Sequence, residues 1–297
     1  AVRCGMQEIF SYPWMEESYV NAILQSTDGI LALSTPPSPA ERFIRASLLP
    51  NLCRAVAKNE RYYGDFAIFE TAQVFRDENY TAPYDEREKL PSQRKNVAGA
   101  FVSAGKDVTG LFRRAKGVVE MMPRYTHMEP YSFRQVSKPV WADEVVWLNI
   151  YLGEEYIGDL ALLSKRVSMA CGIKNVNVML FQLDQDALIP LRSRTNSFRH
   201  LAEYPMTDYD ISLLLDGQVK WADVAQTIGG IKNPLLHGAA FVDEYRGKQV
   251  PEGKKSLTAR LTIGSAEKTL TSAEIEEVAN SVLKKLAKRF GAELRSR

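Results

Sequence analysis

The carboxy-terminal third of the chain alternates between two kinds of hydrophobic spacing. Spacing by two residues predicts strands at 209–215, 239–245, 256–263 and 292–295. Spacing by three and four residues predicts helices at 220–228 and 272–289, and the second helix is expected to be capped by Ser272 and ended by Gly291. Strand–helix–strand–strand–helix–strand is the order of the ferredoxin-like βαββαβ fold.

The preceding two-thirds also mix strands and helices, but without a regular order. Helix-like spacing begins at Glu16, at Leu48 and at Val108. The polar stretch from Arg76 to Asn96 is expected to be a surface loop. Apolar runs with short connections predict strands at 7–12, 66–75, 97–102, 131–136, 145–152, 156–162 and 176–183. Short turns favour an α+β class with a mostly antiparallel sheet over a doubly wound one.

A chain of 297 residues is about twice the usual size of one domain. The stretch Pro190–Ser197 is polar and lacks periodicity, so it has the character of a linker. The sequence therefore predicts a first domain at 1–191, a linker at 192–198 and a second domain at 199–297.

Composition narrows the function only slightly. The net charge is +2, which argues neither for nor against a nucleic-acid partner. The three cysteines are far apart and fit reduced thiols of a cytoplasmic protein, and no apolar run approaches the length of a membrane span. The chain does not begin with Met, so we expect a piece of a longer gene product.

The sequence offers little that could perform catalysis. The three histidines have no metal-ligand spacing to one another or to a cysteine, and no phosphate-binding glycine loop is present. We therefore expect no active site, no bound cofactor and no metal site within this chain.

The basic residues of the last third are better organised. Several of them occupy two adjacent predicted strands, the loop between those strands and the end of the chain: Arg246, Lys248, Lys254, Lys255, Arg260 and Arg295. One reading is ordinary solvated charge, which also suits the end of a helix. Another is a surface for single-stranded RNA, where phosphates meet cations and bases stack on aromatic rings.

Three segments of the last third closely resemble the anticodon-binding domain of the phenylalanyl-tRNA synthetase β-subunit family. They are Phe241–Leu257, Lys268–Ile275 and Gly291–Arg295. The first two-thirds resemble the class II-like core of the same family, and from Ala104 to Leu191 this likeness depends on element order. The matching core segments are Gly5–Ile9, Ile44–Leu52 and Ile68–Phe75.

The resemblance implies a non-catalytic, synthetase-like core that docks the catalytic α subunit in an (αβ)₂ assembly. It also implies that the ferredoxin-like domain binds the anticodon stem-loop of tRNA-Phe. The whole enzyme, a cytoplasmic ligase, uses ATP and Mg²⁺ to esterify phenylalanine to tRNA, whereas this chain alone is expected to be non-catalytic. The expected tRNA-binding residues are Tyr209, Arg246, Lys248, Lys254, Lys255, Arg260 and Arg295.

The sequence also departs from the family. A Pro-x-x-Arg-Arg-Asp segment usually enters the first strand of the anticodon domain, but here Asp208 and Tyr209 stand where the arginines would be. Tyr209 either stacks a base or simply packs. A divergent paralogue that acts as a scaffold without binding RNA is the alternative, and a small-molecule sensor is a weaker one. Editing is not assigned to this chain.

Overall fold

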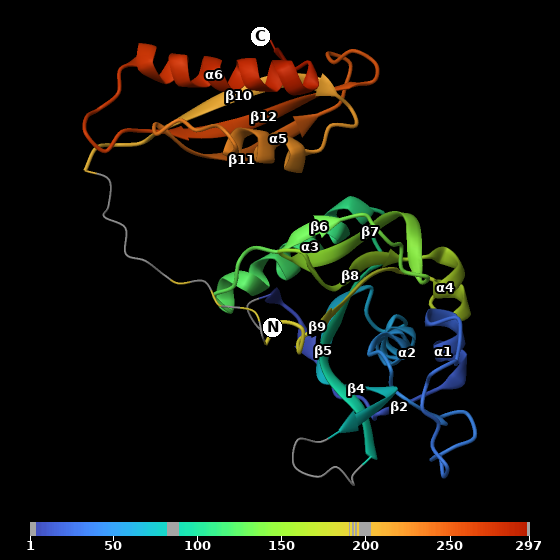
Figure 1. The fold of residues 1–297 in the computed structure, drawn as a ribbon. Helices are drawn as coiled ribbons and strands as arrows, with labels where there is room; N and C mark the ends of the chain where they lie inside the picture. Colours follow the sequence, from blue (N-terminus) through green and yellow to red (C-terminus); the bar gives the residue numbers. More distant parts are fainter. Residues whose placement is uncertain are drawn as a thin grey trace. The chain divides into compact units, whose positions relative to one another are not determined.

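The computed structural model describes residues 4–81, 89–189, 191, 193, 195 and 203–295. Contacts between residues divide the chain into two compact units, Ala1–Asn196 and Ser197–Arg297, which we call the large unit and the small unit (Figure 1). The linker predicted at 192–198 lies outside the described residues, apart from positions 193 and 195.

A seven-stranded sheet organises the large unit. Its strands stand in the order β1-β4-β5-β9-β8-β7-β6, and every neighbouring pair is antiparallel except β1 with β4. The predicted α+β class with an antiparallel sheet is thereby confirmed. The strands are β1 (Gln7–Glu8), β4 (Asp65–Thr81), β5 (Lys89–Ser103), β6 (Ser132–Arg134), β7 (Ala142–Leu152), β8 (Glu155–Leu163) and β9 (Asn177–Asp184).

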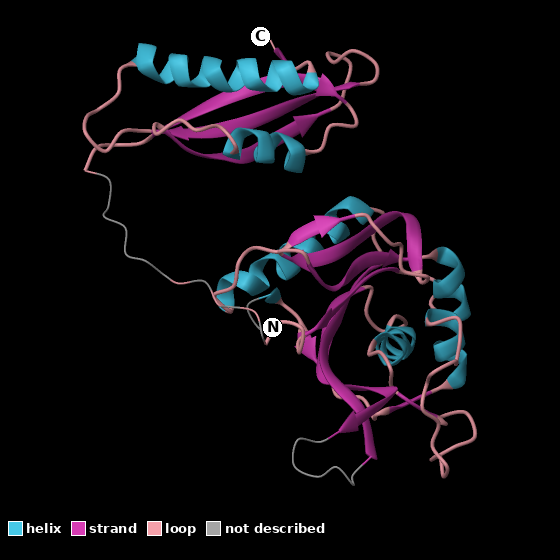
Figure 2. Ribbon diagram, viewed as in Figure 1, coloured by secondary structure: helices cyan, strands magenta, loops and turns pink. Residues whose placement is uncertain are grey.

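Helices cover both faces of this sheet. Figure 2 shows α2 (Leu49–Asn59) against its concave side, where α1 (Glu17–Ile23) and α4 (Lys165–Ala170) complete the layer. On the other side, α3 (Val108–Tyr125) packs over a second core. A two-stranded ribbon, β2 (Trp14–Met15) with β3 (Phe43–Ile44), stands apart from the sheet.

The central strands are buried on both faces. In β5, Ala100 and Val102 belong to the core under α2, while Phe101 belongs to the core under α3. Gly99 precedes them in the strand, and a Cβ there would come within 2.4 Å of the Phe181 ring. A glycine at this position therefore lets the aromatic ring lie directly against β5.

Two predictions for the large unit were wrong. The expected loop at 76–96 is largely strand, because β4 continues to Thr81 and β5 starts at Lys89, with Arg76 opposite Ser92. Backbone pairing between antiparallel strands does not require apolar side chains. The strand expected at 7–12 ends at Glu8, because further along the chain the backbone of Ser11 bonds the Glu70 side chain instead of a strand.

The small unit contains the predicted βαββαβ order. Its sheet order is β11-β12-β10-β13, and all three pairs are antiparallel. The elements are β10 (Thr207–Asp216), α5 (Trp221–Gly229), β11 (Leu236–Tyr245), β12 (Lys254–Ile263), α6 (Ser272–Phe290) and β13 (Glu293–Leu294). Strand β13 pairs only with Leu213 and Leu214, so among the described residues no strand lies along the rest of that edge of β10.

The ends of α6 show why this long helix forms here. Thr271, not Ser272 as expected, is the N-cap, and it exchanges hydrogen bonds with Glu274 in a capping box. At the other end Gly291 adopts a left-handed conformation with φ 62°, as expected for a residue that ends a helix. In the part of the chain that the structure describes, no helix is both long and apolar enough to cross a bilayer.

Candidate nucleic-acid interface

Among the described residues, no helix lies on one face of the small-unit sheet. Alternate residues of β10 and β12, such as Ile211 and Leu257, form a core with α5 and α6. The residues between them therefore lie on the opposite side. We call this side the open face, and its residues are Asp208, Asp210, Ser212 and Leu214 of β10, Lys254, Ser256, Thr258, Arg260 and Thr262 of β12, and Ala240, Asp243 and Tyr245 of β11.

An aromatic ring and a guanidinium lie together at one end of the open face. The Tyr245 ring is 42% exposed, and the Arg295 guanidinium lies 5.5 Å from its centroid. The Arg295 backbone N–H donates to the carbonyl of Ser212 (2.9 Å), and its side chain donates to Gln249 (3.0 Å). The short side chains of Ser212 and Thr258 hydrogen-bond across the strands at 3.0 Å. This end therefore combines a stacking surface, a cation and hydroxyl groups.

Most other cations of the interface already have carboxylate partners. Arg260 donates two hydrogen bonds to Asp210, at 2.7 and 2.8 Å, and these bonds hold the pKa of the Asp210 carboxyl below its usual value. Lys254 lies 3.5 Å from Glu293. Arg246, in the connection after β11, bonds Glu244 at 2.9 Å and the Gly217 carbonyl at 2.8 Å.

Lys248 and Arg295 differ from these three. Among the described residues, neither has a carboxylate within salt-bridge distance. Lys248 is exposed in the connection between β11 and β12. Most basic side chains on or beside the open face are therefore compensated by carboxylates. The positive charge that is left without a carboxylate partner comes from Lys248 and Arg295.

Two of the predicted site residues lie away from the open face. Lys255 is buried, and its Nζ donates to Glu244 at 2.7 Å from the helix side of the sheet. Burial raises the pKa of Glu244, but bonds from Lys255 and Arg246 outweigh it, so this pKa ends below its usual value. Tyr209 stands opposite Leu261 in the register and packs on the core under the helices. The structure thus favours packing over base stacking for Tyr209.

Sequence reasoning overlooked Tyr245, the aromatic ring that does lie on the open face. It is the neighbour of Arg246, and one residue separates it from Asp243 on a strand that contains a bulge. Strict alternation of side chains along β11 would assign Tyr245 to the wrong face of the sheet, because the register shifts between Phe241 and Asp243. Phe241, the other exposed ring of this strand, instead packs edge-on against Trp221 of α5.

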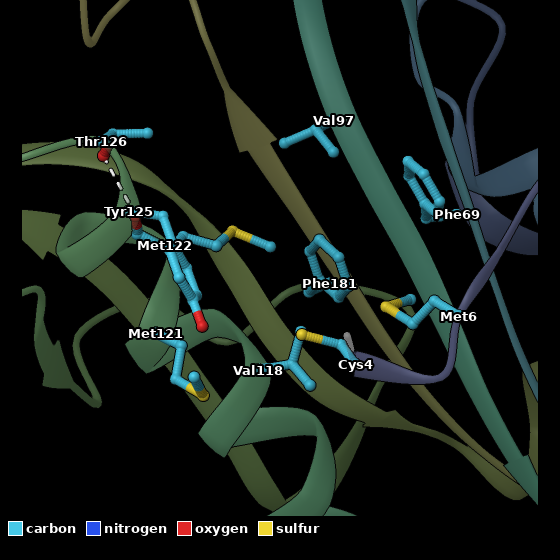
Figure 3. Close-up of a pocket in the computed structure, with 10 residues that line it drawn as sticks. All are labelled: Cys4, Met6, Phe69, Val97, Val118, Met121, Met122, Tyr125, Thr126 and Phe181. Atoms are coloured by element: carbon cyan, nitrogen blue, oxygen red, sulfur yellow. Dashed lines mark hydrogen bonds between the residues drawn. The ribbon is translucent and has the colours of Figure 1, made fainter. Parts of the chain in front are cut away.

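The large unit holds an apolar cavity of about 550 Å³ between α3 and the sheet. Figure 3 shows Met6, Phe69 and Phe181 on the sheet side and Val118, Met121 and Met122 on the helix side. The Thr126 hydroxyl at its edge donates to the carbonyl of Met122. All ten residues that line the cavity are uncharged, so they offer no counter-charge to a nucleotide phosphate or to an amino acid's ammonium and carboxylate. The cavity does not fit ATP with Mg²⁺.

Acidic, cysteine and histidine side chains also form no group of three or more that could hold a metal ion, within residues 4–81, 89–189 and 203–295. We assign no nucleotide–metal complex to this cavity and no chemical step to the described residues.

Comparisons with known proteins agree with both units. Residues 202–295 match the family model of the ferredoxin-fold anticodon binding domain, and residues 1–185 match that of the phenylalanyl tRNA synthetase beta chain CLM domain. A pyrrolysyl tRNA synthetase from Desulfitobacterium hafniense has a similar fold, with a TM-score of 0.50 and 13% identity over 66% of this chain and 69% of that one.

Two curated relatives with the same description align with almost the whole chain. The chain is 28% identical over 303 residues to the phenylalanine–tRNA ligase beta subunit of Carboxydothermus hydrogenoformans, which covers 98% of this chain and 37% of the relative. It is 27% identical over 313 residues to that of Oceanobacillus iheyensis, covering 98% and 36%. The chain thus spans little more than a third of the length of these relatives. With a core and a terminal domain that both match, it belongs to the phenylalanyl-tRNA synthetase β-subunit family.

Proposed function

We propose that this chain contributes two binding functions to a phenylalanine–tRNA ligase. Its small unit binds the anticodon stem-loop of tRNA-Phe, and its large unit docks the catalytic α subunit. The observation that supports the first function is the open face, with Tyr245 and Arg295 side by side in a domain that matches anticodon-binding domains. Unpaired loop bases stack on aromatic rings, and their phosphates bind cations.

The role proposed for each residue of the small unit follows from its contacts. Tyr245 supplies the stacking ring, while Arg295 and Lys248 supply the uncompensated positive charge for phosphates. Arg246, Lys254 and Arg260 reach RNA only by sharing or exchanging their carboxylate partners. Lys255 and Tyr209, which the sequence suggested as ligands, support the domain from its helix side.

The chemistry of the ligase belongs to the other subunit in this proposal. The α subunit uses ATP and Mg²⁺ to activate phenylalanine, and two copies of each subunit form the (αβ)₂ enzyme in the cytoplasm. The present chain presents the tRNA and holds the α subunit, and it has no aminoacylation activity by itself. The uncharged cavity under α3 is consistent with this division.

Substitution of Tyr245 by Ser tests the tRNA-binding role. We expect the affinity for tRNA-Phe to fall about tenfold, because stacking on an aromatic side chain contributes about 1–3 kcal/mol per base. Filter binding at constant salt measures it. Tyr62→Ser, on an exposed tyrosine of the large unit, is the matched control and should leave the affinity for tRNA-Phe unchanged. Equal binding of tRNA-Phe and an unrelated tRNA by the unaltered chain would refute anticodon recognition.

A scaffold that no longer binds RNA is the second candidate function. The observation in its favour is the pairing of Arg246, Lys254 and Arg260 with carboxylates of the same unit, since it lowers the attraction for a polyanion. This candidate predicts α-subunit binding without measurable tRNA binding at any salt concentration. The filter assay therefore distinguishes the two.

A further inference from the structure

Exposed aromatic side chains gather on the segment between β1 and β2 of the large unit. Phe10 is 85% exposed and Tyr12 is 72% exposed. The Tyr12 ring stacks on Trp14 with the centroids 4.6 Å apart and the planes 7° from parallel. Large exposed aromatic groups that are held in place are typical of protein interaction sites.

A buried polar network fixes the backbone that carries these rings. Glu70 is 1% exposed, and its carboxylate accepts hydrogen bonds from the backbone N–H and hydroxyl of Ser11 and from Arg45. Arg45 also donates to the carbonyls of Ser11 and Gln73. Burial lowers the pKa of Arg45, and the neighbouring Glu70 opposes that shift. The paired charges thus hold Ser11 in place under the two exposed rings.

Asn51 of α2 continues the network toward the rings. Its side-chain N–H₂ lies 3.0 Å from the carbonyl of Tyr12 and 3.3 Å from that of Trp14. The backbone N–H of Ile9 donates to Phe69 of β4, and that of Arg45 donates to Pro13, so both ends of the segment are held as well. The segment therefore keeps its shape although its rings face solvent. A binding surface that is already ordered loses less conformational entropy when a partner arrives.

A groove of about 670 Å³ runs between this segment and α2. Phe10, Tyr12 and Trp14 form one wall, Ala55 and Lys58 of α2 belong to the other, and Pro37 also lines it. Polar and charged side chains share the lining with these apolar groups: Ser11, Glu41, Asn51, Arg54 and Asn59. The groove is large enough for one or two side chains of another protein.

Charges around the groove favour a protein over a nucleic acid. Arg54 in the helix wall lies 2.6 Å from Glu41 and 3.6 Å from Glu16, so carboxylates compensate its charge. Lys58 at the rim is exposed and has no salt-bridge partner among the described residues. A polyanion would meet Glu16 and Glu41 here, whereas an apolar segment with one flanking carboxylate would match the rings and Lys58.

We infer that the groove between Phe10–Trp14 and α2 is the surface on which the catalytic subunit of the ligase docks, with an apolar segment that carries an acidic residue. This inference depends on the proposed docking function and names the surface that performs it. Aromatic and Arg-rich centres with a charged rim are typical of such interfaces.

The test uses the whole chain and the catalytic subunit from the same source. The double variant F10S/Y12S should weaken binding to the immobilised subunit by at least about 30-fold, the size of a hot-spot substitution. Lys58→Glu, which breaks no hydrogen bond or salt bridge among the described residues, should weaken it about tenfold through repulsion of the acidic residue. The control V136S/V145S removes two exposed side chains elsewhere on the large unit and should leave the affinity unchanged. Circular dichroism should show the same melting for all variants.

Each other outcome has a distinct meaning. If the unaltered chain binds the catalytic subunit and F10S/Y12S binds equally well, the groove is not the docking surface, and the proposed function stands. If the unaltered chain shows no binding, docking itself fails. Loss of self-association in sedimentation, without loss of subunit binding, would assign the groove to a second copy of this chain. Reduced tRNA binding by F10S/Y12S would assign it to RNA. Both of these results overturn the inference.

Discussion

Lys254 and Lys255 are neighbours in the sequence, yet their side chains occupy opposite faces of β12. Lys254 faces the open side and lies 3.5 Å from Glu293, whereas Lys255 is 4% exposed and paired with Glu244. Alternation along a strand makes this separation inevitable once the strand reaches both residues. The sequence indicated cationic residues in this region, but it did not indicate which one faces solvent, because the strand was expected to start at Ser256.

Substitution of Lys255 by Glu should destabilise the small unit by about 3 kcal/mol, because it places a second carboxylate beside Glu244 in a buried position. We take the lower part of the usual range since Glu244 is partly exposed. Lys254→Glu is the matched variant and should change the free energy of unfolding by less than about 1 kcal/mol. Urea unfolding followed by circular dichroism measures both. Equal stability of the two variants would contradict the buried pair.

Elements were predicted best where hydrophobic periodicity is strong. The helices at α3 and α6 and the hairpin of β7 and β8 follow from apolar spacing and from the turn at Gly153. Polar strand extensions such as 76–81 and 89–96 could not be predicted, because backbone pairing produces no pattern of apolar residues in the sequence. The short helix α4, capped by Ser164, was missed because six residues are too few to show a helical period.

The open face was predicted only in part, for a related reason. The sequence identified the strands and the basic residues, and element order predicted the ferredoxin-like βαββαβ fold. The bulge in β11 decides that Tyr245 reaches that side, and ion pairs decide which cations remain uncompensated. Both depend on contacts between residues far apart in the chain, which a single sequence does not reveal.

The capping box of α6 predicts how stability depends on pH. Bonds from Lys268 and from Thr271 lower the pKa of Glu274 from 4.5 to about 2. A lowered pKa means that the ionised group stabilises the folded state fully above pH 4.5 and loses this contribution as the pH falls from 4.5 toward 2. Glu274→Gln should therefore be less stable than the unaltered chain at neutral pH, and the difference should shrink across that interval.

Urea unfolding at a series of pH values compares the two proteins. Glu276→Gln, a substitution on the same helix outside the capping box, is the control and should show no such convergence. A constant stability difference between pH 6 and pH 2 for Glu274→Gln would contradict the assigned role of this carboxylate.

At the scale of the whole molecule, RNA binding depends on how many basic side chains lack a carboxylate partner more than on the total number of basic residues. The chain has a net charge of +2, and three of the predicted cations in the small unit are compensated on or beside the open face. RNA binding by such a surface depends mainly on stacking and hydrogen bonds, with a limited contribution from released counterions.

The salt dependence of tRNA binding measures that contribution. Two uncompensated cations predict a slope of log K against log salt of about −1.4, whereas all six predicted cations would give about −4. Filter binding at several salt concentrations determines the slope for the unaltered chain, and Arg295→Gln should reduce its magnitude by about half. A slope near −4 would show that the ion pairs of the open face open when RNA binds.

The uncovered edge of β10 has a consequence for how the molecule behaves at high concentration. An unpaired edge strand can form backbone hydrogen bonds with a strand of a second chain, which is the first step toward aggregation. Here Asp208 and Asp210 place carboxylates along that edge at every second position. Two copies that approached edge to edge would bring their Asp208 carboxylates together, so the acid at this position, where the family has an arginine, opposes such pairing, whereas Arg260 already neutralises Asp210.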